Sequence, residues 1–179
     1  MALRKSSAYT HIRVTAYTRI SKKKNKSYIK VVPPQNIVKF SMGDQKLIKN
    51  NKTPFKLTVF AEEKAQIRHT ALEACRQYLN KQLDILVPGA YVFRVVPFPH
   101  HIQREHRMLT GAGADRMSSG MQLSFGKAIS KAALVKKGTK LFEFYLPTQK
   151  SVQETRALFH KVKPKIPCQT KILYEEVRN

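Results

Sequence analysis

A short segment near the middle of the chain gathers side chains that could carry out chemistry. Three histidines, His100, His101 and His106, could bind a metal ion through their ring nitrogens. Their spacing matches no HExxH-type motif, and Glu105 is the one obvious carboxylate nearby that could complete a ligand set. The pattern therefore predicts no metal site.

A glycine-containing run follows the histidines. Gly111 and Gly113 begin like the GxGxxG signature of a dinucleotide-binding loop, but Arg116 stands at the third glycine position. Hydroxyls, histidines and Asp115 are present too, yet a catalytic triad requires a spatial arrangement that no spacing shows. We expect no catalytic residue and no cofactor. A small enzyme acting on RNA through the histidines stays open as an alternative.

Cations in the same segment favour contact with nucleic acid. Residues 97–131 are rich in His, Arg, Gly and Met and poor in β-branched residues. Arginine forks suit phosphates and stacked bases, and glycine lets a backbone approach closely. A solvated surface loop is the alternative interpretation. An irregular stretch of this length is uncommon in a compact domain unless it is functional. This favours a nucleic-acid-binding loop over a solvated surface loop.

The charge of the whole chain points to a polyanionic partner. The 179 residues carry 34 Lys and Arg against 11 Asp and Glu, for a formal charge of +23. Residues 1–60 hold fourteen cations and one acid, whereas residues 61–84 are balanced. Such an excess repels itself unless a polyanion neutralises it, and nucleic acid is the commonest one inside cells. We find neither a basic amphipathic helix nor a lipidation signal, so we expect no membrane contact.

The first 30 residues resemble a basic arm that becomes ordered on RNA. Tyr9, Tyr17 and Tyr28 lie among the cations, and aromatic rings beside cations suit stacking and phosphate contact. A disordered, solvated tail is the alternative, since little of this segment is suited to form a core. The predicted RNA contacts in the arm are Arg4, Lys5, Arg13, Arg19, Lys22, Lys23, Lys24 and Lys26.

Size and composition predict one ordinary domain. The apolar fraction of 42% is sufficient for a core, no apolar run is long enough to span a membrane, and no secretory signal is present. We therefore expect an intracellular protein. Cys75 and Cys168 lie 93 positions apart without metal-ligand spacing, which argues against a zinc site or a disulfide framework. We expect Cys75 to be a buried thiol.

Two helices and several strands must position these residues. Apolar residues at helical spacing predict a helix from Glu62 to Leu83, with acids in its first turn. A capping-box pattern at Ser151–Glu154 predicts the start of a second helix, which Pro164 and Pro167 close. The predicted strands are 37–40, 55–60, 91–96, 134–135, 140–145 and 170–174.

The order of these elements predicts an α+β fold with a mainly antiparallel sheet and two packed helices. The fifth strand follows the fourth through a turn at Lys137-Gly138, so we expect these two strands to pair. The expected organisation is a basic RNA-binding arm at 1–30 and a single domain at 31–179. The domain carries an extended loop at about 100–131.

Several short motifs, in the same order, closely resemble one family of proteins. That family is the archaeal and eukaryotic branch of the universal large-subunit ribosomal protein L-sixteen, also called L-ten-e. The resemblance spans nearly the whole chain. The chain ends soon after the last predicted strand, without the C-terminal extension expected of eukaryotic members, so we expect an archaeal source. The matching motifs are Gln66-Ile67-Arg68, Ala71-Leu72-Glu73-Ala74, Pro99-His100-His101, Ala112-Gly113-Ala114-Asp115-Arg116, Gly120-Met121 and Phe125-Gly126-Lys127.

The resemblance implies an α+β protein of the large ribosomal subunit, seated on rRNA near the aminoacyl-tRNA site and the peptidyl-transferase centre. It implies RNA contacts at His100, His101, Arg104, Arg107, Arg116, Lys127 and Lys131. It also implies a loop that faces tRNA and the peptidyl-transferase centre, comprising Arg107, Met108, Gly111, Ala112, Gly113, Ala114, Asp115 and Arg116.

We accordingly expect a structural ribosomal constituent that supports translation and subunit maturation, and no enzyme. The implied partners are large-subunit rRNA, tRNA in the aminoacyl site and neighbouring ribosomal proteins, with no small-molecule substrate. The expected location is the cytoplasm, bound to ribosomes. The alternative is a nucleic-acid-binding module outside the ribosome, such as an RNA chaperone or a chromatin protein.

Overall fold

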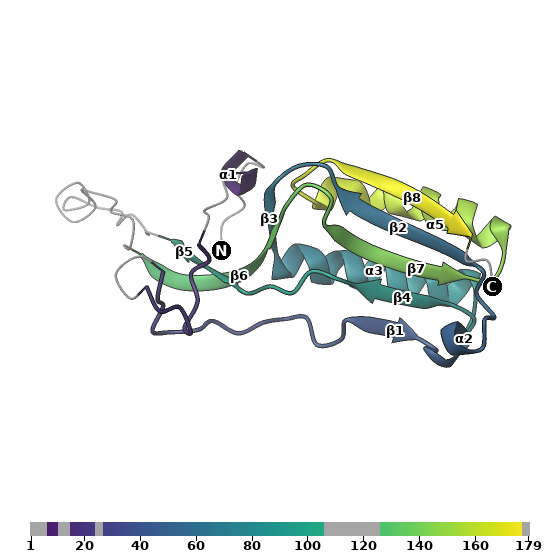
Figure 1. Ribbon diagram of the computed structural model, residues 1–179, viewed down its shortest axis with the longest axis horizontal. Coiled ribbons are helices and arrows are strands. Elements are labelled where there is room, and N and C mark those ends of the chain that lie inside the picture. Colours follow the sequence, from purple (N-terminus) through teal and green to yellow (C-terminus); the bar gives the residue numbers. More distant parts are fainter. Residues whose placement is uncertain (1–6, 11–14, 24–26, 106–125, 177–179) are drawn as a thin grey trace.

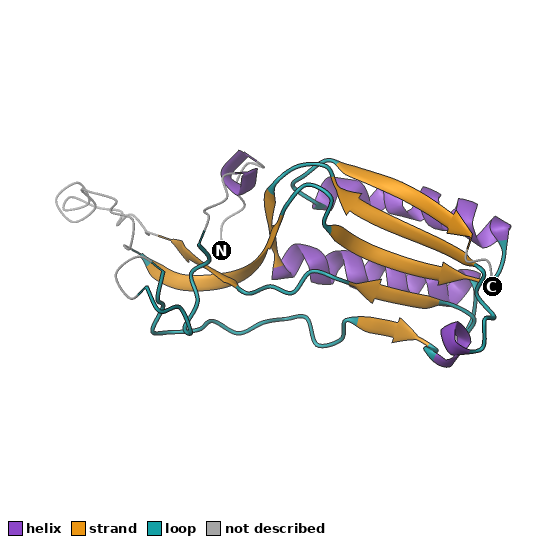
Figure 2. Cartoon of the chain, in the orientation of Figure 1, coloured by secondary structure: helices purple, strands orange, loops and turns teal. Residues whose placement is uncertain are grey.

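The computed structural model describes residues 7–10, 15–23, 27–105 and 126–176. These residues form two antiparallel sheets, and two long helices cover one face of the larger sheet (Figure 2). The predicted α+β class is therefore confirmed. The chain is elongated, because the smaller sheet projects away from the larger one (Figure 1).

The larger sheet has five strands in the order β1-β4-β7-β2-β8. Its middle strands alternate apolar and polar residues, so that one face is buried; Leu57, Phe142 and Phe144 are fully buried. The rings of Phe93 and Phe144 stack on neighbouring strands with their centroids 4.7 Å apart. The strands are β1 (Ser41–Gly43), β2 (Phe55–Ala61), β4 (Val92–Val95), β7 (Lys140–Leu146) and β8 (Thr170–Glu176).

Helices α3 (His69–Leu86) and α5 (Gln149–Val162) pack on this face. Every third or fourth residue of α3 is buried, as a one-sided apolar stripe requires, and Cys75 lies within that stripe. The prediction of a buried thiol at Cys75 is therefore confirmed. Burial raises the pKa of this thiol to about 12.

The second helix starts earlier than its predicted cap. Thr148 is the N-cap, since its Oγ1 accepts a hydrogen bond from the backbone N–H of Ser151 at 3.3 Å. The predicted cap at Ser151 is therefore three residues late, because Ser151 already lies in the first turn. One side of this helix is apolar and faces the core, with Val152, Phe159 and Val162 buried.

The smaller sheet has three strands in the order β3-β6-β5. These are β3 (Ala65–Arg68), β5 (His101–Glu105) and β6 (Lys127–Val135). Its base joins the main core through buried Ile67, Ala133 and Val135. The described residues also include three short helical pieces, which are α1 (Ser7–Thr10), α2 (Lys46–Lys49) and the 3₁₀ turn η1 (Lys163–Lys165).

Two local predictions near the N-terminal half are wrong. The helix predicted from Glu62 begins at His69, because Ala65–Arg68 pairs with β6 as strand β3. Ile67 is buried in the strand, and the helical pattern also placed it on the apolar face. Its apolar character therefore fits a helix as well as a strand. The strand predicted at 37–40 is absent there, and the strand in this part of the chain is β1 at Ser41–Gly43, which pairs with β4.

Two predictions about the second half also need correction. The turn at Lys137-Gly138 joins β6 to β7, but these strands lie in different sheets and do not form the predicted hairpin. The stretch 97–131 is not irregular throughout, because β5 and the start of β6 lie within it and pair with each other. The residues between them, 106–125, lie outside the described residues.

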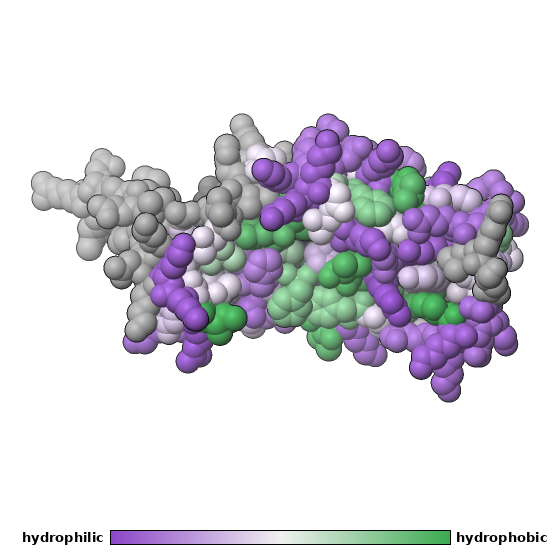
Figure 3. Space-filling view, viewed as in Figure 1, coloured by the Kyte–Doolittle hydropathy of each residue, from purple (hydrophilic) through white to green (hydrophobic). Residues whose placement is uncertain are grey.

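The surface combines many polar side chains with scattered apolar ones. Hydrophilic residues predominate on the face in Figure 3, with apolar patches between them. Val38, Val96 and Phe98 are among the exposed large hydrophobic residues. In the described ranges, no helix has the length and apolar character needed to cross a membrane.

Candidate nucleic-acid interface

All of the predicted RNA contacts fall in two chain segments, residues 1–30 and 97–131, which we call the extension. The remaining residues, 31–96 and 132–179, are called the body. The extension has fourteen Lys and Arg against Glu105 and Asp115, whereas the body has twenty against nine acids. The extension, although it is the shorter of the two, therefore holds more than half of the net charge.

Strands β5 and β6 form the framework of the extension. They pair antiparallel from His101↔Ala132 to Glu105↔Lys127, with a register shift between Gln103 and Arg104. The pairing brings both ends of the segment 106–125 together at the end of the small sheet that lies away from the body (Figure 1). Residues predicted to face tRNA are thus attached to a hairpin, not to a free loop.

The N-terminal strap, residues 15–23 and 27–30, packs against this hairpin. The backbone N–H of Tyr17 donates to Nδ1 of His101 at 3.0 Å, and the N–H of Ile102 donates to the carbonyl of Tyr17 at 2.9 Å. Tyr17, Ile29 and Ile102 form a separate buried apolar cluster. The expectation that the arm has little core is therefore wrong for Tyr17 and Ile29.

Aromatic and cationic groups meet where the strap crosses β5; we call Tyr17, His101 and Arg104 the seam. The rings of Tyr17 and His101 stack with centroids 5.4 Å apart, and the guanidinium carbon of Arg104 lies 4.0 Å from the Tyr17 ring centroid. A cation this close to a ring face is stabilised by the ring quadrupole. Burial lowers the pKa of Arg104, whose guanidinium stays charged at physiological pH.

The strap also closes on itself between its two described parts. The N–H of Thr18 donates to the carbonyl of Ser27, and the N–H of Ile29 donates to the carbonyl of Thr18, both at 3.0 Å. This closure presents the intervening cations to solvent: Arg19, Lys22 and Lys23 are exposed. The strap thus combines a buried inner side with a cationic outer side.

The other predicted contacts have different surroundings. His100 is exposed, with Nδ1 3.0 Å from the carbonyl of Phe98. Lys127 is exposed, and Lys131 is half-buried on β6. His101 is only 4% exposed and its Nδ1 accepts from the backbone, so the geometry favours a protein-facing role for it. The predicted contacts outside the described residues are Arg4, Lys5, Arg13, Lys24, Lys26, Arg107 and Arg116, together with loop residues Met108 and 111–115.

Arg68, which appears in a family motif but not among the predicted RNA contacts, lies at the base of the extension. Arg68 ends β3, and its Nη1 donates to the Tyr9 hydroxyl at 3.1 Å. Burial, Arg68 and Lys131 lower the pKa of His69, so this ring is neutral at physiological pH. A neutral ring fits its role, because His69 Nδ1 accepts the backbone N–H of Asn36 at 3.3 Å. The sequence pattern predicted a helix over Ala65–Arg68 and so did not reveal that this segment is a strand, which places Arg68 on the small sheet.

Metal binding finds no support within the parts of the chain that the structure describes. No group of three or more His, Cys, Asp or Glu side chains in those ranges is arranged to hold a metal ion. The described geometry instead offers exposed cations and aromatic rings, which suit phosphate and base contacts.

Comparison with known proteins connects this arrangement to a family. The family model described as "Ribosomal protein L16p/L10e" matches residues 15–173. "Large ribosomal subunit protein uL16" of Methanoculleus marisnigri is 38% identical over 176 residues, covering 98% of this chain and 97% of that protein.

Two further proteins of the same name agree with this match. The protein of Thermofilum pendens is 38% identical over 179 residues, covering 99% of this chain and 100% of that protein. The protein of Thermoplasma acidophilum is 42% identical over 136 residues, covering 75% of this chain and 72% of that protein. These relatives are archaeal, as the sequence led us to expect. The chain therefore belongs to the ribosomal protein L16p/L10e family, and the resemblance found in its motifs is confirmed.

Proposed function

We propose that this chain is a structural constituent of the large ribosomal subunit that binds rRNA through its extension, near the aminoacyl-tRNA site and the peptidyl-transferase centre. The observation that carries the proposal is the charge of the extension, fourteen cations against two acids. Family membership supports the ribosomal part, since the relatives are named as large-subunit proteins. The rRNA part follows from charge and geometry.

The exposed strap and hairpin cations supply the first part of the proposed interface. Arg19, Lys22, Lys23 and Lys127 are exposed and can approach phosphates without unfolding the chain, and the exposed His100 can add a ring contact. The predicted contacts Arg4, Lys5, Arg13, Lys24 and Lys26 extend the same arm. Each phosphate that they neutralise releases condensed counterions, which makes binding salt-dependent.

The seam supplies the second part, because it fixes the strap to the hairpin. The backbone of Tyr17 donates to the ring of His101 and accepts from the backbone N–H of Ile102, while Arg104 stacks on the Tyr17 ring. We therefore assign His101 to positioning within the proposed interface, and Lys131 and Arg104 to its inner edge. Two cationic segments far apart in sequence then meet the RNA as one surface.

The residues 106–125 supply the proposed contact with tRNA and the peptidyl-transferase centre. The hairpin holds the ends of this segment opposite each other at Glu105 and Lys127. In the proposal, Arg107 and Arg116 meet RNA phosphates, and Gly111 and Gly113 allow the turn between them. The protein neutralises and positions RNA, and it performs no catalysis of its own. Its further partners are neighbouring ribosomal proteins, and its location is the cytoplasm, on the ribosome.

Sedimentation of native lysate tests this proposal. A sucrose gradient is run at two salt concentrations, and the chain is followed beside large-subunit rRNA. We expect stoichiometric sedimentation with the large subunit at both salts. Sedimentation with free nucleic acid but never with large subunits would contradict the proposal and support an RNA chaperone or chromatin protein instead.

A further inference from the structure

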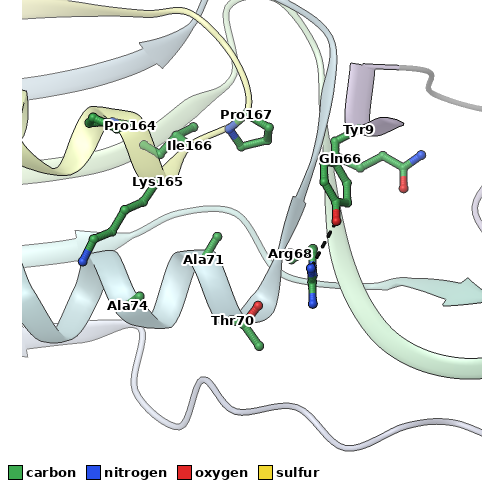
Figure 4. A pocket seen from close by; sticks show the side chains of 10 residues that line it. All are labelled: Tyr9, Gln66, Arg68, Thr70, Ala71, Ala74, Pro164, Lys165, Ile166 and Pro167. Atoms are coloured by element: carbon green, nitrogen blue, oxygen red, sulfur yellow. Dashed lines mark hydrogen bonds between the residues drawn. The ribbon is translucent and has the colours of Figure 1, made fainter. Parts of the chain in front are cut away.

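A groove of about 430 Å³ lies at the junction between the body and the extension (Figure 4). Ala71 and Ala74 on the first turns of α3 form its floor, where their small side chains leave room. One side is formed by β3 and α1, and the other by the turn that follows α5. Its volume falls in the range of about 300–1,000 Å³ typical of sites for small ligands.

The two sides of the groove differ in chemistry. Pro164, Ile166 and Pro167 make one side apolar. On the opposite side, Arg68 lies against Tyr9, with its guanidinium carbon 5.9 Å from the ring centroid and its Nη1 donating to the hydroxyl. This pair offers a ring face and a planar cation next to each other. Together the sides suit a flat group that has apolar faces and carries negative charge.

The charges around the groove favour an anionic occupant. Besides Arg68, Lys165 lines the groove and extends away from Tyr9 along α3 (Figure 4). A shallower hollow of about 690 Å³ shares the apolar side and adds Lys163, His160 and Glu63. The cations exceed the single acid, so the potential in the groove attracts phosphate.

An unpaired nucleotide meets both requirements better than duplex RNA does. A base that is turned out of a helix presents two apolar faces to aromatic or proline side chains, while its phosphates remain available to cations. A duplex hides its base faces in the stack, so it would leave the apolar side of the groove uncovered.

We propose that the groove binds one unpaired nucleotide of RNA, with the base against Tyr9 and the proline side and the phosphate near Arg68. This inference rests on the proposed function, because rRNA supplies the nucleotide. It adds a second contact to the interface, on the far side of β3 from the strap. Among the described residues, the predicted RNA contacts do not line the groove.

Photo-crosslinking in assembled large subunits tests the occupant. Tyr9 is replaced by p-benzoylphenylalanine, which keeps an aromatic ring in the groove, and Tyr174 on β8 is replaced in the same way as the matched control. We expect an RNase-sensitive adduct from position 9 at a yield at least fivefold above that from position 174. An adduct with a protein, or equal yields at both positions, would overturn the proposal.

A second variant fills the groove without touching its cations. Ala74→Phe places a ring on the floor, and Ala157→Phe on the exposed side of α5 serves as the control. We expect Ala74→Phe to bind a single-stranded rRNA fragment about tenfold more weakly, as the loss of one stacked base predicts. Circular dichroism checks that both variants keep their helices.

The two tests separate the failure of the groove from the failure of the proposed function. Sedimentation of the unmodified chain with large subunits, combined with an unchanged affinity of Ala74→Phe, would remove the groove and leave the ribosomal function intact. Failure of the unmodified chain to sediment with large subunits would contradict the proposed function itself.

Discussion

The body and the extension are held together in different ways. The body packs two helices on five strands, and its buried apolar residues form one continuous cluster. The described part of the extension has the small cluster of Tyr17, Ile29 and Ile102. The body also has ion pairs on its surface, such as the one between Lys56 and Glu175 at 3.1 Å. The extension has only two acids to pair with its fourteen cations.

This difference separates stability from RNA affinity. Apolar burial of the kind seen in the body stabilises a fold without any partner. The extension gains little from apolar burial and carries a field that a polyanion must neutralise. Substitutions in the body should therefore change the free energy of unfolding, and substitutions in the extension should change RNA binding.

The largest expected effect is the removal of a core side chain from the body. Leu79 is fully buried on α3, so Leu79→Ala should lower the free energy of unfolding by about 2–5 kcal/mol. Urea unfolding measures this change. Leu173→Ala on β8 is the control, because Leu173 is 40% exposed and its loss should cost much less. A cost below about 1 kcal/mol for Leu79→Ala would mean that the helix stripe is not the core.

Two glycines with the same backbone twist offer a matched pair. Gly43 and Gly138 have φ of 81° and 82°, but a Cβ on Gly43 would lie 2.0 Å from the carbonyl oxygen of Tyr91, whereas Gly138 has open space. Gly138→Ala should cost about 1–2 kcal/mol from its left-handed backbone alone. Gly43→Ala should cost more, because β1 must move away from β4.

Thermal unfolding of both glycine variants makes the comparison. Equal losses of stability would show that β1 moves freely and contributes nothing to the body. A larger loss for Gly43→Ala would place the edge strand within the cooperative unit.

A substitution in the seam should lower RNA affinity more than it lowers the stability of the body. Tyr17→Ala removes the ring that Arg104 and His101 contact, so the strap should no longer fix the hairpin. We expect rRNA affinity to fall about tenfold, the loss of about 1.4 kcal/mol, as for one aromatic contact. Filter binding with an rRNA fragment measures it. Tyr17→Phe keeps the ring and the backbone hydrogen bonds and should retain the affinity.

The smallest expected effects concern the buried thiols of the body. Burial raises the pKa of Cys75 to about 12 and that of Cys168 to about 11. Unfolded thiols ionise near pH 8.5, so the unfolded state loses protons first and the free energy of unfolding should fall as pH rises from about 9 to 11. Below pH 8 the thiols should not affect stability.

Thiol alkylation at pH 9 checks the same property. The folded chain should react about a hundredfold more slowly than the unfolded chain, because the thiolate is the reactive form. Rapid labelling of Cys75 in the folded chain would contradict its place in the core.

Local patterns predicted the body well because its contacts follow from short-range periodicity. The alternation at 55–60 appears as strand β2, which is one residue longer, and the apolar stripe appears in α3 from His69 onward. The error at Ala65–Arg68 has a non-local cause: pairing with β6, some 65 residues later, turns a helix-compatible segment into a strand. The turn at Lys137-Gly138 failed similarly, because local signals do not say which sheet a strand joins.

The extension was harder to predict from sequence. Its charge and aromatic content indicated RNA, and the motifs identified the family. The seam joins Tyr17 to His101 across 84 positions, so neither residue carried a local sign of its partner. Arg68 was missed for the same reason, since its contact with Tyr9 spans 59 positions. Residue types thus indicated the chemistry, and the fold showed which residues share a surface.

The most direct test of the division between body and extension is the salt dependence of rRNA binding. Lys22, Lys23 and Lys127 of the extension are changed together to Gln, and Lys49, Lys81 and Lys150 of the body form the matched control; all six are exposed. The extension variant should reduce the slope of log affinity against log salt by about two units, as the loss of three phosphate contacts predicts, with little change for the body variant. Equal slopes for the two variants, or a larger change for the body variant, would contradict the account.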